Sequence, residues 1–117
     1  MGFWYNAAMR RANRVDANQG DIVKALRDSG AYVRVINQGD GLPDLLVGYR
    51  GITLLLEVKD GRKPPSQRTL TPLEAEFFKE WPGGILAVVK SPEDALKELS
   101  KSVGIEGRGS RPVLAKN

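Results

Sequence analysis

Two acidic side chains and a lysine stand near the ends of an apolar stretch, residues 42–60, which reads LPDLLVGYRGITLLLEVKD. If this stretch folds as a hairpin about its central Arg-Gly pair, Asp44 faces Glu57 on the neighbouring strand, where opposite Cβ atoms are roughly 4.5–5.5 Å apart. Two carboxylates at that distance resist joint ionisation unless a cation lies between them. Glu57 and Lys59 are two residues apart, so they project from the same face of a strand. The spacing therefore favours a small cluster that could hold a hard divalent cation beside a phosphate.

Each of these residues also has an ordinary structural explanation. Aspartate after proline at the start of a strand is usually a turn residue, and Glu-x-Lys on a strand is usually a solvated face with a weak ion pair. The flanking runs, Leu45–Val47 and Ile52–Leu56, contain a single polar side chain, Thr53. Strands of that kind are covered on both faces. The charges at their ends then lie at the boundary of a core, where an unpaired charge is costly, and this setting favours the cluster.

The composition limits the chemistry that such a cluster can perform. The chain has 117 residues, with no cysteine and no histidine, and this length suits one compact domain. Thiolate and imidazole metal sites, histidine bases and Ser-His triads are excluded. Any metal must be bound by oxygen, which favours Mg²⁺, Mn²⁺ or Ca²⁺. The lack of cysteine fits an intracellular, cytoplasmic protein, and no apolar run approaches the ~20 residues of a membrane span.

The positive charges are unevenly distributed around the acidic pair. The net charge is +4, and basic residues gather at the start of the chain, in the loop after the hairpin and in the tail. A basic rim around an acidic centre suits a phosphate polymer that meets a metal ion; a basic protein with ordinary solvated charges is the alternative. The candidate DNA-binding residues are Arg62, Lys63, Ser66, Gln67 and Arg68 after the hairpin, and Arg10, Arg11 and Arg14 near the start.

The periodicity on either side of the hairpin predicts an alternating α/β chain. Ile22, Val23 and Leu26 recur at helical spacing, which predicts a helix that starts at an Asp16 cap. Thr71-Pro72-Leu73-Glu74 is typical of a helix start with a capping box. In chain order we expect a helix over 17–29, a strand over 31–36, the two hairpin strands, a helix over 72–81, a strand over 85–89 and a helix that begins at Ser91-Pro92.

The two ends of the chain differ from its middle in composition. Residues 1–12 are apolar, aromatic and basic without a clear period, and residues from 102 onward are rich in glycine, serine and basic side chains. We therefore expect an N-terminal arm over 1–12, one domain over 13–101 and a flexible basic tail over 102–117. The aromatic side chains of the arm could pack on the domain, pack on a second subunit or stack on bases.

Pro43-Asp44 followed by Glu57-Val58-Lys59 resembles the signature of the PD-(D/E)XK nuclease superfamily. The longer run over 41–78, with its Lys-Pro-Pro-Ser and Leu-Thr-Pro-Leu-Glu pieces, resembles the small phage-type VRR-NUC nucleases within it, and the similarity covers roughly residues 13–101. The resemblance implies an α/β fold, a mixed central β-sheet flanked by helices with the restriction-endonuclease-like αβββαβ core. It is also compatible with a phage protein in a bacterial host.

The resemblance implies a role for each residue of the cluster. Asp44, Glu57 and the backbone carbonyl of Val58 would bind Mg²⁺, with Mn²⁺ as a substitute. Lys59 would orient the attacking water or stabilise charge on the phosphate oxygens. Gln19 stands where archaeal junction resolvases carry a glutamate, and this departure leaves it either a catalytic residue in a supporting role or an ordinary surface residue of the first helix.

These features together predict a metal-dependent hydrolase, a DNA endonuclease that cuts phosphodiester bonds. The resemblance implies a structure-specific enzyme that resolves four-way (Holliday) junctions as a homodimer, because a two-fold protein fits a nearly two-fold substrate. A nicking or flap-cutting nuclease would use the same cluster. A DNA-binding accessory protein that keeps the fold without turnover is the alternative from another class, and the neutral Gln19 is the feature that favours it.

Overall fold

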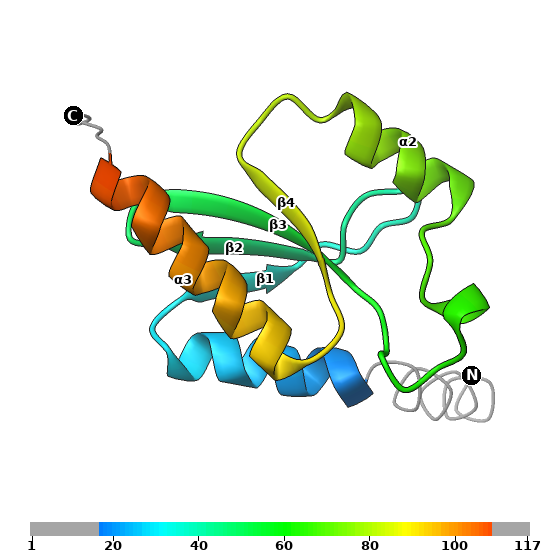
Figure 1. The fold of residues 1–117 in the computed structure, drawn as a ribbon, viewed down its shortest axis with the longest axis horizontal. Helices are drawn as coiled ribbons and strands as arrows, with labels where there is room; N and C mark the ends of the chain where they lie inside the picture. The colour runs from blue at the N-terminus through cyan, green and yellow to red at the C-terminus, as the bar shows by residue number, and fades with distance from the viewer. Residues whose placement is uncertain (1–16, 109–117) are drawn as a thin grey trace, which may run out of the picture.

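A four-stranded sheet with the strand order β1-β2-β3-β4 forms the centre of the molecule (Figure 1). The structure is a computed structural model that describes residues 17–108 of the chain. The strands are β1 (Tyr32–Val35), β2 (Leu45–Tyr49), β3 (Ile52–Val58) and β4 (Ile85–Val89). The first three strands pair antiparallel, and β4 joins β3 in parallel. This mixed sheet with flanking helices confirms the predicted α/β fold class.

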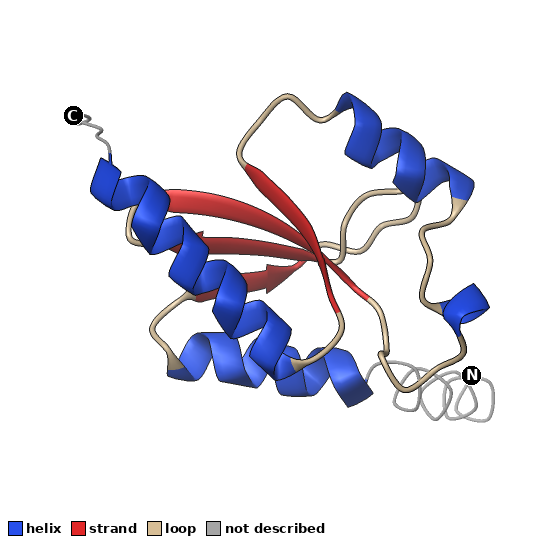
Figure 2. Ribbon diagram, in the orientation of Figure 1, coloured by secondary structure: helices blue, strands red, loops and turns tan. Residues whose placement is uncertain are grey.

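Helices occupy two separate regions around the sheet. They comprise a helix over 17–28, a short 3₁₀ helix η1 (Pro65–Gln67), α2 (Pro72–Glu80) and α3 (Pro92–Arg108). Figure 2 shows the helix over 17–28 and α3 lying together, whereas α2 stands apart from both. None of the helices described within residues 17–108 is long and apolar enough to cross a membrane.

The hydrophobic core lies between these two neighbouring helices and one face of the sheet. Leu45 and Val47 of β2 and Leu54 and Leu56 of β3 are fully buried, and their spacing of two places them on a single face. The helices contribute Ile22, Val23, Leu26, Ala95 and Leu99 to the same core. The other face carries Leu46 and Val88, which are half-buried, and Leu55, which is 6% exposed. The strands are therefore less covered than their apolar sequence predicts, because α2 contributes no buried residue.

A two-residue turn fixes the register of the central hairpin. Arg50 and Gly51 have φ angles of 52° and 82°, as in a type I′ turn, whose twist matches that of the flanking strands. The ladder runs from the pair Tyr49–Ile52 to the pair Leu45–Leu56. The hairpin expected from the sequence is confirmed, with the turn at the expected residues.

The end of α3 differs from the sequence expectation. The helix continues to Arg108, past residue 102, where a flexible tail was expected to begin. Ser102 is fully buried, and its hydroxyl donates to the Leu99 carbonyl over 2.7 Å, which holds this turn of the helix. The arm over 1–12, the rest of the tail from 109, and the candidates Arg10, Arg11 and Arg14 lie outside the described residues.

Candidate active site

Strand alternation brings Asp44 and Glu57 together on the half-covered face of the sheet. Leu45 pairs with Leu56, so Asp44 and Glu57 form the next pair outward in the same register. Because Leu56 points into the core, Glu57 points to the opposite face. The Val58 N–H donates to Asp44 Oδ2 over 2.8 Å. Asp44 is 8% exposed and Glu57 is 3% exposed, so the cross-strand pair expected from the sequence is formed and buried.

The backbone around Asp44 is held on both sides. Pro43 is among the fully buried side chains, which fixes the path of the chain into the strand. The Asp44 carbonyl accepts a hydrogen bond from the Ile36 N–H over 2.8 Å, which extends the pairing beyond β1. The Asp44 carboxylate is therefore set in place before any ligand arrives.

Lys59 joins the acidic pair from the end of β3. Its Nζ lies 3.5 Å from Glu57 Oε2 and 2.9 Å from Glu74 Oε1. Its side chain is 14% exposed, so the ammonium lies at the edge of the buried cluster and faces solvent on one side. The three residues expected to do the chemistry are thus neighbours, and a third carboxylate, that of Glu74, stands beside them.

Burial controls the protonation of the cluster. Burial, with the nearby negative charges of Asp44 and Glu74, raises the pKa of Glu57 to about 9. Burial also raises the pKa of Asp44, although the hydrogen bond from the Val58 N–H opposes that rise. Burial acts to lower the pKa of Lys59, but the hydrogen bond and the charge of Glu74 outweigh it, so this pKa is raised. With no cation bound at neutral pH, the pair holds a proton and the lysine keeps its charge.

The oxygen atoms of the pair fit a small, hard cation. Glu57 Oε1 is buried and has no hydrogen-bond partner among the described residues, which leaves an oxygen of the kind that Mg²⁺ prefers. Within residues 17–108, however, there is no group of three acidic, histidine or cysteine side chains placed to hold a metal. An ion here would take two carboxylates and fill its remaining positions with backbone carbonyl, water or phosphate oxygen, as Mg²⁺ commonly does.

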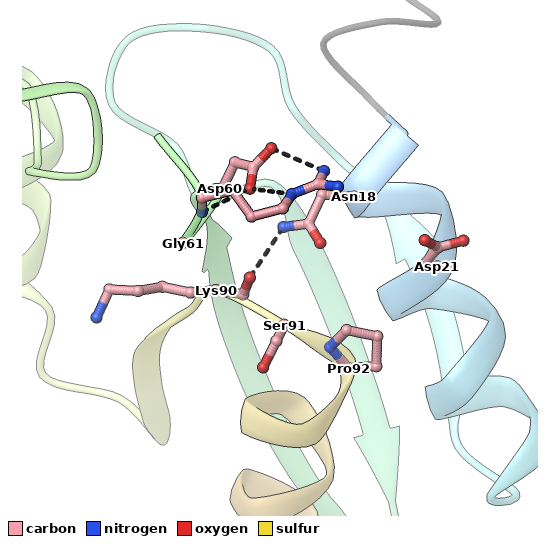
Figure 3. Close-up of a pocket in the computed structure, with 8 residues that line it drawn as sticks. Asn18, Asp21, Asp60, Gly61, Lys90, Ser91 and Pro92 are labelled. Carbon is pink, nitrogen blue, oxygen red and sulfur yellow. Dashed lines mark hydrogen bonds and ion pairs between the residues drawn. The ribbon is translucent and has the colours of Figure 1, made fainter. Parts of the chain in front are cut away.

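Gln19 and its neighbour Asn18 have different surroundings in the structure. Gln19 lines a hollow with Val35 and with other residues of its own helix. Asn18, one residue earlier, donates from Nδ2 to the carbonyl of Lys59 over 3.0 Å and to that of Lys90 over 3.1 Å (Figure 3). Asn18 therefore ties the helix to the ends of β3 and β4, a role that nothing in the sequence indicated. A supporting role for Gln19 stays a prediction.

The loop after β3 divides the candidate DNA-binding residues between two hollows. Lys63 and Gln67 line a hollow of 220 Å³ with Lys59. Arg62 lines another, of 430 Å³, beside Asn18 and the start of α3 (Figure 3). Its guanidinium makes two bonds of 3.0 Å to the Asp60 carboxylate, and these bonds lower the pKa of Asp60 to about 2.

The two remaining candidates in this loop differ in their surroundings. Ser66 is exposed within η1. Arg68 follows η1, and its Nε is buried without a hydrogen-bond partner among the described residues. The structure therefore puts Lys63 and Gln67, rather than the whole set, next to Lys59.

Glu74 is the site residue that sequence reasoning missed. Its expected part in a capping box is confirmed: its carboxylate accepts from the Thr71 N–H over 2.9 Å, and its own N–H donates to Thr71 Oγ1 over 3.3 Å. The capping box gave a sufficient local reason for a glutamate at this position. No local pattern indicated that the same carboxylate also reaches Lys59.

A comparison with known proteins found a solved structure with a similar fold. A solved structure described as a VRR_NUC domain matches this one with a TM-score of 0.57 and 25% sequence identity, covering 74% of this chain and 94% of that chain. No protein-family model matches the sequence, and no curated protein matches it either. The resemblance to VRR-NUC nucleases stated from the sequence is thus confirmed in the fold.

Proposed function

We propose that this protein is a metal-dependent endonuclease that hydrolyses phosphodiester bonds in DNA. The observation that carries the proposal is the buried Asp44–Glu57 pair with Lys59 beside it, in a fold similar to that of a VRR_NUC domain. Buried acids without a cation are costly, and Asp44 and Glu57 lie on the face of the sheet opposite the core residues Leu45 and Leu56. A site for a cation and a phosphate explains the arrangement.

In this proposal each residue of the cluster has a distinct task. Asp44, Glu57 and the Val58 carbonyl would hold Mg²⁺ or Mn²⁺, which supplies positive charge at the phosphate and lowers the pKa of a water molecule. The Val58 N–H keeps the Asp44 carboxylate oriented. Lys59 stays protonated at neutral pH because its pKa is raised, so it acts as a hydrogen-bond donor to the phosphate oxygens and not as a base.

The DNA backbone would lie along the hollow that Lys59 shares with Lys63 and Gln67. A lysine ammonium and an amide at one wall can hold successive phosphates by charge and hydrogen bonding. Arg62 is already engaged by Asp60, so its contribution should be smaller.

A branched substrate and a homodimer are the finer parts of the proposal. Tyr32, Val35, Leu73 and Trp81 are large apolar residues that the described part of the chain leaves exposed, and they offer area for a second copy. A dimer would present two sites related by two-fold symmetry, which suits a four-way junction. A nicking or flap-cutting enzyme remains the alternative within the same chemistry.

An accessory role without turnover is the second candidate. Two features favour it: the neutral Gln19, and the acidic cluster, where no group of three acidic side chains within residues 17–108 is placed to hold a metal and Glu74 bonds Lys59. Such a protein would bind DNA with the same basic loop and leave it uncut.

Cleavage of labelled DNA substrates separates these candidates. A four-way junction, a matched duplex, a flap and a single strand would be incubated with Mg²⁺ and then with Mn²⁺, beside Asp44→Ala and the exposed α2 control Glu76→Gln. Paired symmetric cuts in the junction, lost in Asp44→Ala and kept in the control, would support a dimeric junction enzyme. Cuts in flap or duplex keep the nuclease and discard the junction. Tight binding without any cut favours the accessory protein.

A further inference from the structure

The amine of Lys59 has two carboxylate neighbours, and the one it bonds is not the catalytic candidate. Nζ donates to Glu74 Oε1 over 2.9 Å, whereas Glu57 Oε2 lies 3.5 Å away. The Glu74 side chain is 17% exposed, so the bond is largely screened from solvent. The position of the amine is therefore set by α2, an element that carries none of the acidic pair.

Glu74 is itself held rigidly at the start of α2. Its Oε1 accepts the Thr71 N–H over 2.9 Å as well as the Lys59 amine. Because the capping box closes from both sides, the carboxylate cannot follow the lysine. A lysine side chain has many rotamers of similar energy, and a fixed anionic acceptor selects one of them.

The first turn of α2 is also in contact with the chain that leads to Asp44. A Cβ on Gly41 would collide with the carbonyl group of Leu73, so the two backbones are as close as glycine allows. Gly41 has a φ of 82°, which also favours glycine. The same turn of α2 therefore meets the segment before Asp44 on one side and Lys59 on the other.

Helix α2 has little other reason to be fixed at this place. None of its residues is buried, and Figure 2 shows it standing apart from the two helices that cover the core. Its first turn meets the rest of the molecule through the Glu74–Lys59 bond and the Gly41 contact. A helix that has no buried residue and begins at the site is best explained by the site.

We propose that Glu74 is a positioning residue, which fixes the Lys59 amine beside the acidic pair so that it can meet the scissile phosphate. The proposal rests on the proposed nuclease function and adds to it a residue outside the acid–acid–lysine motif. Two other roles for Glu74 are possible on chemical grounds: a helix cap and nothing more, or a third metal ligand. Each predicts a different pattern in the variants below.

Glu74→Gln and Thr71→Ala separate the cap from the contact with Lys59. Glutamine can close the same capping box but carries no charge for the lysine. Thr71→Ala removes the hydroxyl half of the box and leaves the Glu74–Lys59 bond in place. We expect Glu74→Gln to lower kcat by about 10-fold, the scale of one charge-assisted bond, with unchanged KM for DNA. Thr71→Ala should lower Tm and leave kcat within about two-fold of the wild type.

The opposite pattern overturns the proposal. If Glu74→Gln keeps the wild-type kcat while Thr71→Ala and Glu74→Ala are equally impaired, Glu74 is a helix cap only. If Glu74→Gln raises the Mg²⁺ concentration needed for half-maximal rate, Glu74 is a metal ligand. The Mg²⁺ dependence is therefore measured for every variant.

A measurement without DNA distinguishes failure of this inference from failure of the nuclease proposal. A double-mutant cycle in urea unfolding, with Glu74→Gln and Lys59→Met alone and together, measures the coupling of the two side chains whether or not the protein cuts. Coupling close to zero beside a working nuclease removes the role of Glu74 and leaves the nuclease. Clear coupling in a protein that cuts no substrate removes the nuclease, and the positioning role with it, and leaves only a structural ion pair.

Discussion

Replacing Glu57 by glutamine should stabilise the metal-free protein at neutral and alkaline pH. Glu57 is 3% exposed, and its pKa is raised from 4.5 to about 9 by burial and by the carboxylates of Asp44 and Glu74. The pKa of this carboxyl is higher in the folded state than in the unfolded chain. Such a group contributes its full stability when the pH is below the pKa of the unfolded chain, here 4.5. That contribution is lost as the pH rises toward and through the pKa of the folded protein, about 9, because the unfolded chain releases its proton first.

The size of the effect follows from the difference between the two pKa values of Glu57, in the unfolded and the folded state. Each pKa unit corresponds to about 1.4 kcal/mol, so the loss between pH 4.5 and 9 is on the order of 5 kcal/mol. That is a large share of the 5–15 kcal/mol typical of a whole domain. Glutamine has nearly the same shape and no proton to lose, and its N–H₂ group can donate to the neighbouring carboxylates. Glu57→Gln should therefore be the more stable protein at pH 8 by several kcal/mol.

Urea unfolding in EDTA, followed by tryptophan fluorescence from pH 5 to 9, measures this difference. The free energy of unfolding of the wild type should fall across the range, and that of Glu57→Gln should fall much less. Asp44 adds to the fall because its pKa is raised too. Glu74, whose pKa is lowered, loses its contribution only at acid pH, outside the range. Equal slopes in the two proteins, with Glu76→Gln as the surface control, would refute this account of the buried pair.

Four further substitutions test other parts of the site. Asp44→Asn should lower cleavage by about 100-fold or more yet keep DNA binding in a gel shift, because it weakens metal binding and relieves repulsion of the phosphate; lost binding would make Asp44 structural. Lys63→Ala should weaken DNA binding and reduce the slope of log affinity against log salt by about 0.9, and Arg62→Ala, already paired with Asp60, should do less; equal effects contradict the two-hollow arrangement. Gly41→Ala should cost about 1–3 kcal/mol of stability and lower kcat, because it collides with Leu73; a wild-type rate would show that α2 is not needed in its place.

The acidic pair could be predicted because every step behind it is local. A two-residue turn at Arg50 and Gly51 sets the register of both strands, and a period of two then decides which side chains share a face. No knowledge of the rest of the chain is needed to place Asp44 opposite Glu57. The capping box at Thr71 is local in the same sense, and it too was found where the sequence placed it.

The contacts of Asn18 and Glu74 were not predicted, because they depend on how separate helices and strands pack against one another. A helix turns about 100° per residue, so Asn18, which bonds the Lys59 carbonyl, and Gln19, which lines a hollow with Val35, point in different directions. The rotation of that helix is set by its buried face, which packs on the sheet. Glu74 reaches Lys59 because of the path of the loop over 61–70, a segment without periodicity. Neither the rotation of this helix nor the path of this loop can be predicted from a short sequence motif.

One face of the sheet stabilises the fold and the other carries the candidate active site. This arrangement explains how the protein tolerates the free-energy cost of the buried acidic pair. One face, closed by the helix over 17–28 and α3, carries the fully buried core. The other carries the acidic pair and Lys59, under a helix with no buried residue. A cluster of buried charge can be kept there because the core face supplies the free energy that the pair removes. Substitutions in the pair should then raise stability and lower activity together, whereas substitutions at Leu54 or Leu56 should lower both through loss of the fold.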